Sequence, residues 1–215
     1  MGAHVAELVF ADTSERDDLG AFVARAVRLD QQGVVRLRNR GEDRVEAWVA
    51  TPFDVLATRT VAGSATPSDV AVAGSELLSG LAILRGDRVD PGASKDLMWR
   101  SALPPAEGWK QVDDLPVAVM TELADQGVAV ARENSGPHGT PPASLLDQTV
   151  LTVSGSGLDV KIPLRCLFAL SGMGFLGSGD LEGNVRVTAT DAWLRIDARF
   201  GAVVRRRHAL LPLLV

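Results

Sequence analysis

Residues 158–207 read LDVKIPLRCLFALSGMGFLGSGDLEGNVRVTATDAWLRIDARFGAVVRRR, and this stretch decides the fold. Pro163 is suited to the first position of a helix, because the N–H that proline lacks has no partner there. Leu164, Leu167 and Phe168 then recur at helical spacing, so one apolar stripe faces a core. The stretch therefore predicts a short strand followed by an amphipathic helix.

Three further strands are predicted after that helix. Gly172 ends the helix, since glycine adopts the left-handed cap conformation at little cost. Apolar and polar residues alternate over 185–189, which is the period of a half-buried strand. The apolar runs that begin at Trp193 and at Ala202 continue the pattern and are separated by a turn at Phe200.

A similar unit is predicted at the other end, over 5–61. A strand over 5–10 precedes a helix over 17–29, for which Ser14 is the predicted N-cap. Three strands follow, over 34–38, 45–50 and 55–61. Two interpretations remain open, because the two units either form a duplication, with Trp48 and Trp193 in equivalent places, or are independent units of a common kind.

The middle of the chain contains two helices and much loop. Residues 68–84 predict a strand that leads into a helix with Leu77, Leu78, Leu81 and Leu84 as its buried stripe. The loop-rich stretch 86–109 carries Trp99 and Trp109, which we expect to hold it against the core rather than to bind a partner.

A helix is predicted over 114–133, with Val119, Leu123 and Val130 as core residues. Residues 134–142 then read as a loop, and 150–161 as a hairpin. The fold class is therefore α+β, with two related strand–helix–three-strand units, antiparallel sheets and a central helical and loop-rich insertion. The predicted domains are an N-terminal unit over 1–85, an insertion over 86–143 and a C-terminal unit over 144–215.

Composition narrows the class of protein. The 215 residues carry a net charge of −5, and their hydrophobic content of 46% and charged content of 23% are ordinary for a globular protein. Cys166 is the only cysteine, so the chain forms no internal disulfide. The start of the sequence lacks the pattern of a signal peptide, and no apolar run is long enough to span a bilayer. We expect a cytoplasmic protein without a membrane partner.

The residues that match catalytic or cofactor-binding motifs lack the flanking elements or the spacing that such sites require. Gly172, Gly174 and Gly177 match G-x-G-x-x-G, but a dinucleotide site needs a strand before this motif and a helix after it. His4, His138 and His208 are far apart and match no metal-ligand spacing. We expect Cys166 to be buried and structural, and the pairs Asp17–Asp18 and Asp113–Asp114 to open helices. The sequence thus predicts no enzyme, no cofactor and no metal site.

Arginine gives the most suggestive pattern. Arg36, Arg38 and Arg40 alternate along a predicted strand and therefore share one face, with Arg25 and Arg28 on the preceding helix. Arg205, Arg206 and Arg207 close the last long strand. These eight residues are candidate sites for an anion or a partner. The alternative is a solvated face neutralised by Glu42, Asp43 and Glu46 on the next strand.

The layout resembles the repeated module of DNA sliding clamps. Residues 45–84 form three predicted strands followed by a strand and a helix, as in a clamp, and the end, LLPLLV over 210–215, is similar to the apolar strand that ends bacterial clamps. The resemblance fails over 86–150. It implies that the helix face bearing Arg25 and Arg28 looks toward DNA, and that apolar pockets take peptides from partners.

A second resemblance is to winged-helix proteins, on the helix over 163–175 and the strands over 185–199. The predicted role is a non-catalytic binding or assembly module, with a protein partner or self-association, plausibly as a homodimer. The alternative is a nucleic-acid-associated protein, either clamp-like or winged-helix-like.

Overall fold

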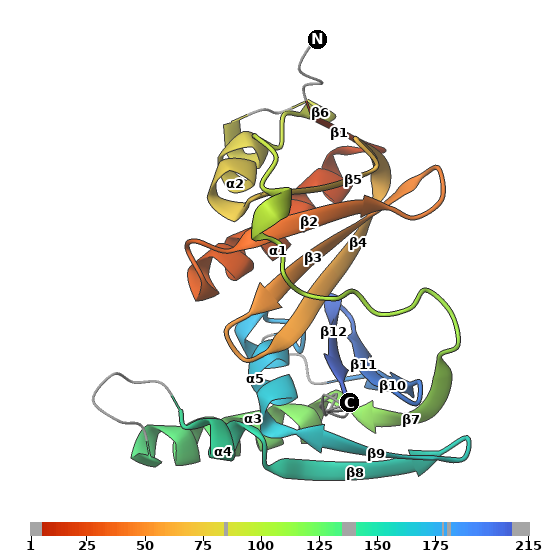
Figure 1. Ribbon diagram of the computed structural model, residues 1–215. Helices are drawn as coiled ribbons and strands as arrows, with labels where there is room; N and C mark the ends of the chain where they lie inside the picture. Colours follow the sequence, from red (N-terminus) through yellow and green to blue (C-terminus); the bar gives the residue numbers. More distant parts are fainter. Residues whose placement is uncertain (1–5, 84–85, 135–140, 178, 180–181, 208–215) are drawn as a thin grey trace, which may run out of the picture. The chain divides into compact units, whose positions relative to one another are not determined.

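The computed structural model describes residues 6–83, 86–134, 141–177, 179 and 182–207 (Figure 1). The three histidines, Val5, Leu84, most of the predicted loop over 134–142 and the tail 210–215 lie outside the described residues. The chain forms two compact units: unit 1 is Met1–Pro52 with Leu56–Ala102, and unit 2 is Phe53–Val55 with Leu103–Val215. The division into 1–85, 86–143 and 144–215 stays a prediction beside these two units.

Unit 1 contains one curved antiparallel sheet and two helices. Its elements are β1 (Glu7–Phe10), α1 (Thr13–Leu29), β2 (Val34–Asn39), β3 (Arg44–Thr51), β4 (Val55–Thr66, its first residue in unit 2), β5 (Asp69–Ala73), α2 (Gly74–Ile83), β6 (Arg88–Val89) and the 3-10 turn η1 (Asp96–Met98). The strand order is β5-β2-β3-β4, and β1 pairs with both β4 and β6. Helix α1 lies across one face of this sheet and packs on α2 (Figure 1).

The start of α1 differs from the prediction. Asp12, rather than Ser14, is the N-cap, because its carboxylate accepts hydrogen bonds from the backbone N–H groups of Ser14 and Glu15. The buried residues of α1 are Leu19, Phe22 and Val23, with Leu19 and Val23 fully enclosed. Asp17 and Asp18 lie inside the helix and do not open it, so that prediction was wrong.

Unit 2 has a four-stranded sheet, a separate hairpin and two long helices. Its elements are β7 (Lys110–Pro116), α3 (Val117–Asn134), α4 (Ala143–Leu146), β8 (Thr149–Gly155), β9 (Leu158–Pro163), α5 (Leu164–Gly172), β10 (Asn184–Ala189), β11 (Trp193–Ala198) and β12 (Gly201–Arg206). The order of the sheet is β12-β11-β10-β7, and β8 pairs with β9. The hairpin turn has positive φ at Ser156 and Gly157, as a tight two-residue turn requires.

The predicted helix over 114–133 starts three residues too early. Residues through Pro116 belong to β7, which pairs with β10, and Asp114 forms an ion pair with Arg186 there instead of opening a helix. The predicted core residues of α3 were also wrong in part, because Val119 and Val130 are 41% and 42% exposed.

The buried face of α3 combines the fully enclosed Met120 with small residues, including Ala124 and Gly127. A Cβ added at Gly127 would lie 2.3 Å from the side chain of Leu164, so the glycine permits close packing on α5.

The two units share one plan with their parts in opposite order. Unit 1 runs β1-α1-β2-β3-β4 and then β5-α2-β6, whereas unit 2 runs β7-α3-β8 and then β9-α5-β10-β11-β12. In each unit, two strands of the three-element part pair with two strands of the five-element part. The pairs are β5 with β2 and β6 with β1 in unit 1, and β7 with β10 and β8 with β9 in unit 2. The helices of the two parts pack together as well. The predicted α+β class with two related units is confirmed.

Candidate binding site

Arg36 and Arg38 alternate along β2 and share one face of the unit 1 sheet, and Arg40 follows directly after the end of that strand; the three are called the β2 arginines. Arg36 binds Asp69 through two hydrogen bonds, from Nε at 2.7 Å and from Nη2 at 2.8 Å. This contact raises the pKa of the Arg36 guanidinium above its ordinary value. Arg38 lies 4.0 Å from the same carboxylate, and Arg40 pairs with Glu46 at 3.1 Å. Carboxylates on the neighbouring strands therefore neutralise this face.

The tryptophans of the long connection are half-buried. Trp99 donates its indole N–H to the carbonyl of Ser101 and lies under the Arg36 guanidinium, 5.9 Å from the ring centroid. Trp109 donates to the carbonyl of Pro105. Each ring thus has a local partner within its own unit.

The two candidate arginines of α1 lie in its second half. Arg25 is half-buried, and Arg28 is exposed in the last turn, where a cation favours the helix dipole. Their predicted role in anion binding stays a prediction.

The β12 arginines, Arg205, Arg206 and Arg207, have a different environment. The guanidinium of Arg206 lies over Trp193, 4.7 Å from the ring centroid. Arg207 donates to two backbone carbonyls, those of Thr190 at 2.8 Å and of Asp159. Among the described residues neither side chain has a carboxylate within ion-pair distance. Carbonyl groups and an aromatic ring hold these arginines without cancelling their charge.

A pocket of about 140 Å³ opens beside the β12 arginines. Its charged lining consists of the three arginines, Lys161 from β9 and a single carboxylate, Asp147. Buried Leu194 of β11 and half-buried Pro163 supply apolar lining, and Thr149 supplies a hydroxyl group. The structure thus brings one of the predicted arginine clusters together with a lysine that the sequence did not single out.

Arg165 was missed as a functional candidate. It is 6% exposed on α5 and donates from Nε to Asp147 at 2.9 Å and from Nη1 to the carbonyl of Phe53 at 2.7 Å. Arg205 also contacts Asp147, but less closely, with its Nη2 atom 3.5 Å from the carboxylate. The same Nη2 atom lies 3.4 Å from Asp54. The available signal was a lone charged residue in an otherwise apolar helix, since such a residue needs a partner when buried.

Cys166, next to Arg165 in sequence, is buried as predicted. Only 1% of the residue is exposed, and burial raises the pKa of its thiol to about 12. The protonated thiol is a poor nucleophile and a poor metal ligand at neutral pH. The described residues contain no group of three or more His, Cys, Asp or Glu that could hold a metal ion.

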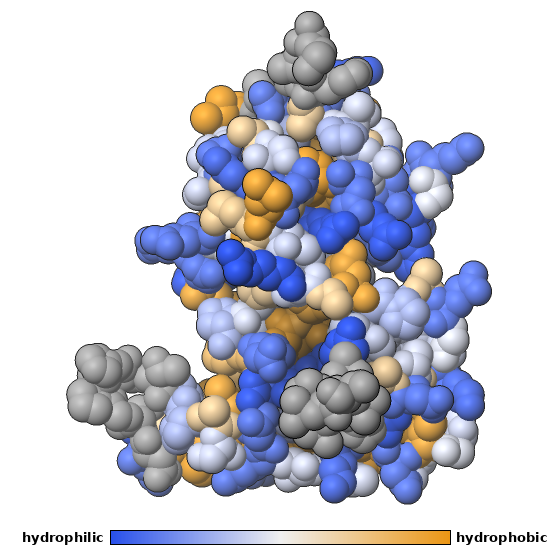
Figure 2. Space-filling view, in the orientation of Figure 1, coloured by the Kyte–Doolittle hydropathy of each residue, from blue (hydrophilic) through white to orange (hydrophobic). Residues whose placement is uncertain are grey.

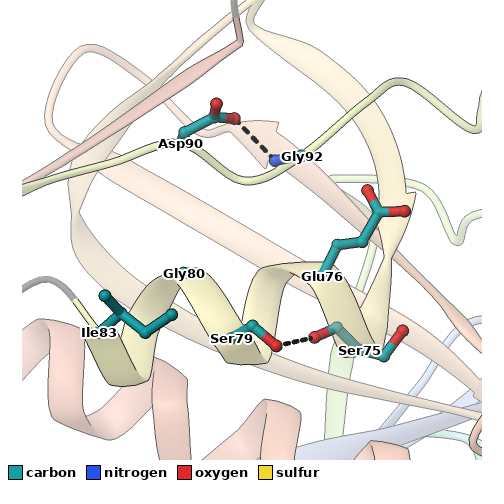
Figure 3. Close-up of a pocket in the computed structure, with 7 residues that line it drawn as sticks. All are labelled: Ser75, Glu76, Ser79, Gly80, Ile83, Asp90 and Gly92. Carbon is teal, nitrogen blue, oxygen red and sulfur yellow. Dashed lines mark hydrogen bonds between the residues drawn. The ribbon is translucent and has the colours of Figure 1, made fainter.

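Unit 1 has an open groove of about 620 Å³ between α2 and the segment that follows β6 (Figure 3). Glu76 and Ile83 line it from the helix, and Asp90 lines it from the segment, where its carboxylate accepts a hydrogen bond from the N–H of Gly92. None of the described residues that line the groove is cationic. It is acidic where the pocket of unit 2 is basic.

The exposed surface in view is mostly hydrophilic, with separate apolar patches (Figure 2). Within the described ranges, the exposed large apolar residues are Ile83, Leu97, Met98, Val119, Val130 and Phe200. No helix in the described ranges is long and apolar enough to cross a membrane.

Two family models match the chain, and both are described only as domains of unknown function. DUF8010 matches residues 3–101, and DUF8185 matches residues 104–210. Their boundary falls where the two compact units meet in the sequence. No curated protein matches the sequence.

The fold is that of bacterial sliding clamps. The chain is similar to the DnaN sliding clamp, the DNA polymerase III subunit beta, of Bartonella birtlesii, with 12% identity and a TM-score of 0.59 over 97% of this chain and 67% of that one. A putative DNA polymerase III beta subunit of Eubacterium rectale matches with 12% identity and a TM-score of 0.62 over 95% and 65%. The Thermotoga maritima beta subunit matches with 11% identity and a TM-score of 0.53 over 97% and 66%.

The chain spans about two thirds of the length of these clamps. The predicted resemblance to the clamp module is therefore confirmed as a likeness of fold. The expectation that it fails over 86–150 was wrong, because the matches cover 95–97% of this chain. The strands assigned to a winged-helix wing, β10 and β11, are instead inner strands of the four-stranded sheet of unit 2.

Proposed function

We propose that the chain is a non-catalytic, cytoplasmic module that binds a protein partner or a second copy of itself through a clamp-type fold. The observation that carries this proposal is the neutralisation of the β2 arginines by Asp69 and Glu46. A surface that binds DNA must offer cations to phosphates in place of condensed counterions. Arginines that already pair with carboxylates release few counterions from DNA, so they contribute little to its binding.

The charges of the helices support the same proposal. If the helices faced DNA, as the clamp resemblance implies, they would need an excess of basic residues. Helices α1, α2, α3 and α5 together carry five arginines and seven Asp or Glu residues. A duplex beside these helices would meet a net negative charge, which lowers affinity at every salt concentration.

The second candidate is nucleic-acid association. The likeness of the fold to sliding clamps favours it, and so do the β12 arginines, which have no carboxylate within ion-pair distance among the described residues, apart from the long contacts of Arg205. We rank it second because the α1 arginines share their helix with an equal number of carboxylates.

Sedimentation of the chain with a labelled duplex DNA, at low salt and at about 0.15 M salt, separates the two candidates. The proposal predicts that the DNA sediments as free DNA at the higher salt, whether the chain is monomeric or self-associated. Co-sedimentation that weakens steeply with salt, and that is lost when Arg36, Arg38 and Arg40 are all replaced by Ala, would contradict it.

A further inference from the structure

The pocket of unit 2 holds an arginine whose hydrogen bonds are incomplete. The Nε atom of Arg205 is buried and has no acceptor in the described structure. Its Nη2 atom reaches Asp54 and Asp147 only at 3.4 and 3.5 Å. Charge-assisted N–H to carboxylate bonds are normally about 2.7–2.9 Å long. Arg205 is therefore held in place, yet it lacks a close anionic partner.

Asp147, the carboxylate that lines the pocket, cannot supply that partner, because Arg165 already holds it. Asp147 accepts from Nε of Arg165 at 2.9 Å and from its Nη2 as well. Of the lining residues, Lys161, Arg205, Arg206 and Arg207 bring four positive charges against one negative charge. The free chain thus leaves an excess of positive charge around the pocket, and this excess favours an anionic ligand.

The size of the pocket limits what the ligand can be. Sites for whole small molecules measure about 300–1,000 Å³, so a pocket of about 140 Å³ admits one side chain rather than a nucleotide or a cofactor. Leu194 and Pro163 make part of the lining apolar, which suits the carbon chain that carries a carboxylate. Asp147 lies beside the cations and would repel a phosphate, with its charge near −2, more than it would repel a carboxylate.

We propose that this pocket binds the side-chain carboxylate of an acidic segment in a protein partner, with Arg205 as its central ligand and Lys161 and Arg207 at its edge. The inference rests on the proposed protein-binding role, and it names the chemistry of the partner. A guanidinium presents two parallel N–H groups to a carboxylate, so Arg205 can bind both oxygens once the ligand displaces its long contacts. The apolar lining contacts a neighbouring aliphatic group of the same segment.

Fluorescence anisotropy with two labelled peptides tests this chemistry. One peptide alternates Asp with Leu, and the other alternates Asn with Leu, so that only the carboxylates differ. We expect the full chain to bind the acidic peptide at least about tenfold more tightly than its amide counterpart, the effect of losing a charge-assisted contact. Equal affinity for the two peptides, or displacement of the acidic peptide by millimolar inorganic phosphate, would overturn the proposal.

Variants identify the residues that bind. Arg205→Gln should weaken binding of the acidic peptide at least about tenfold, whereas Arg195→Gln should change it less than about twofold. The second variant is the matched control, because it removes the same charge from the neighbouring strand β11, at a residue that pairs with Asp197 and does not line the pocket. An equal loss of affinity in both variants would show that only the net charge of the chain matters, and it would overturn the assignment of Arg205 as the central ligand.

Arg205 also contacts Asp54 and Asp147, so its replacement can disturb the fold. Lys161→Gln avoids this difficulty, since Lys161 is exposed and has no carboxylate within ion-pair distance in the described part of the chain. It should weaken binding of the acidic peptide about threefold, as expected for the loss of one charge at the edge of the pocket. Unchanged affinity would count against the site. If neither peptide binds while DNA also stays free, this inference fails and the proposed function stands. Steeply salt-dependent DNA binding would remove the proposed function instead.

Discussion

The β2 and β12 arginines are two triplets of the same residue type that differ in how many members have a carboxylate partner, since all three have one in the first triplet and only Arg205 has one in the second. Each of the β2 arginines lies within 4.0 Å of a carboxylate. The β12 arginines rely on an aromatic ring, backbone carbonyls and the long contacts of Arg205. The comparison teaches that a cluster of arginines in sequence does not define a cationic surface, because the neighbouring strands decide whether its charge remains.

Strand register is the cause of the difference. Arg38 lies directly opposite Asp69 on β5 and opposite Glu46 on β3, so acidic residues flank the β2 triplet on both sides. On β11 the residues opposite Arg205 and Arg206 are Leu194 and Trp193, which carry no charge. Cross-strand neighbours interact directly, so carboxylates pair with every arginine of the first triplet, whereas Arg206 and Arg207 of the second keep their charge.

The largest expected effect concerns the buried charge that supports the second triplet. Replacing Arg165 by Met should lower the free energy of unfolding by about 2–3 kcal/mol, because it removes hydrogen bonds to Asp147 and to the carbonyl of Phe53. The loss of stability is no larger because the Asp147 side chain is 53% exposed, so water hydrates its carboxylate when Arg165 is absent. Chemical denaturation measures the change.

Arg195→Met is the matched control for that variant. Arg195 pairs with Asp197 on the same strand, where both side chains are partly exposed, so its loss should cost less than about 1 kcal/mol. Equal costs for the two variants would show that Arg165 contributes no more than a surface ion pair.

The second prediction breaks the comparison itself. Replacing Asp69 by Asn together with Glu46 by Gln removes the carboxylates of the β2 triplet and leaves its three arginines unpaired. The double variant should then bind duplex DNA where the wild type does not, with a salt slope that steepens by about one unit for each freed arginine. Anisotropy at several salt concentrations measures this gain, and a variant that still ignores DNA would disprove the neutralisation argument.

The smallest expected effect concerns Cys166, which lies beside Arg165 in sequence. The thiol is buried and its pKa is raised to about 12, so it stays protonated at pH 8 despite the cations nearby. A thiol reagent should label it only after unfolding, and Cys166→Ala should cost about 1 kcal/mol through a small cavity. Rapid labelling of the native chain would mean that the β12 arginines activate this thiol.

The raised pKa of Cys166 also has a defined sign in the pH dependence of stability. The unfolded chain releases the thiol proton near pH 9, whereas the folded chain keeps it to about pH 12. The contribution of this group is therefore fully present below pH 9 and is lost as the pH rises from 9 toward 12. In Cys166→Ala this alkaline loss should be smaller.

Much of the fold followed from local patterns. The helix over 164–172 and the strands after it have strong apolar periodicity, so their order was predictable without tertiary information. The buried face of α3 was not, because the helix has two partly apolar faces, and the choice between them depends on tertiary packing such as that of Gly127 against Leu164. Strand β7 was not predicted, and its last three residues were assigned to the helix, because Pro116 is common both at helix starts and at strand ends.

The candidate site was predictable only in part. The sequence identified Arg205, Arg206 and Arg207, since three consecutive arginines are conspicuous. It could not identify their surroundings, because Arg205 contacts Asp54 across 151 positions of sequence, and Lys161 comes from a different strand. Whether an arginine has a carboxylate partner depends on which strands pair and in which register. Local sequence patterns do not contain this information.

The most direct test of this account measures the wild-type chain against two ligands in one buffer. Anisotropy titrations at about 0.15 M salt would compare the labelled Asp–Leu peptide with a labelled duplex DNA. The account predicts saturable binding of the acidic peptide and no binding of the duplex. Binding of the duplex without binding of the peptide would contradict it, because the β2 face would then be the cationic surface and the β12 pocket would have no acidic partner.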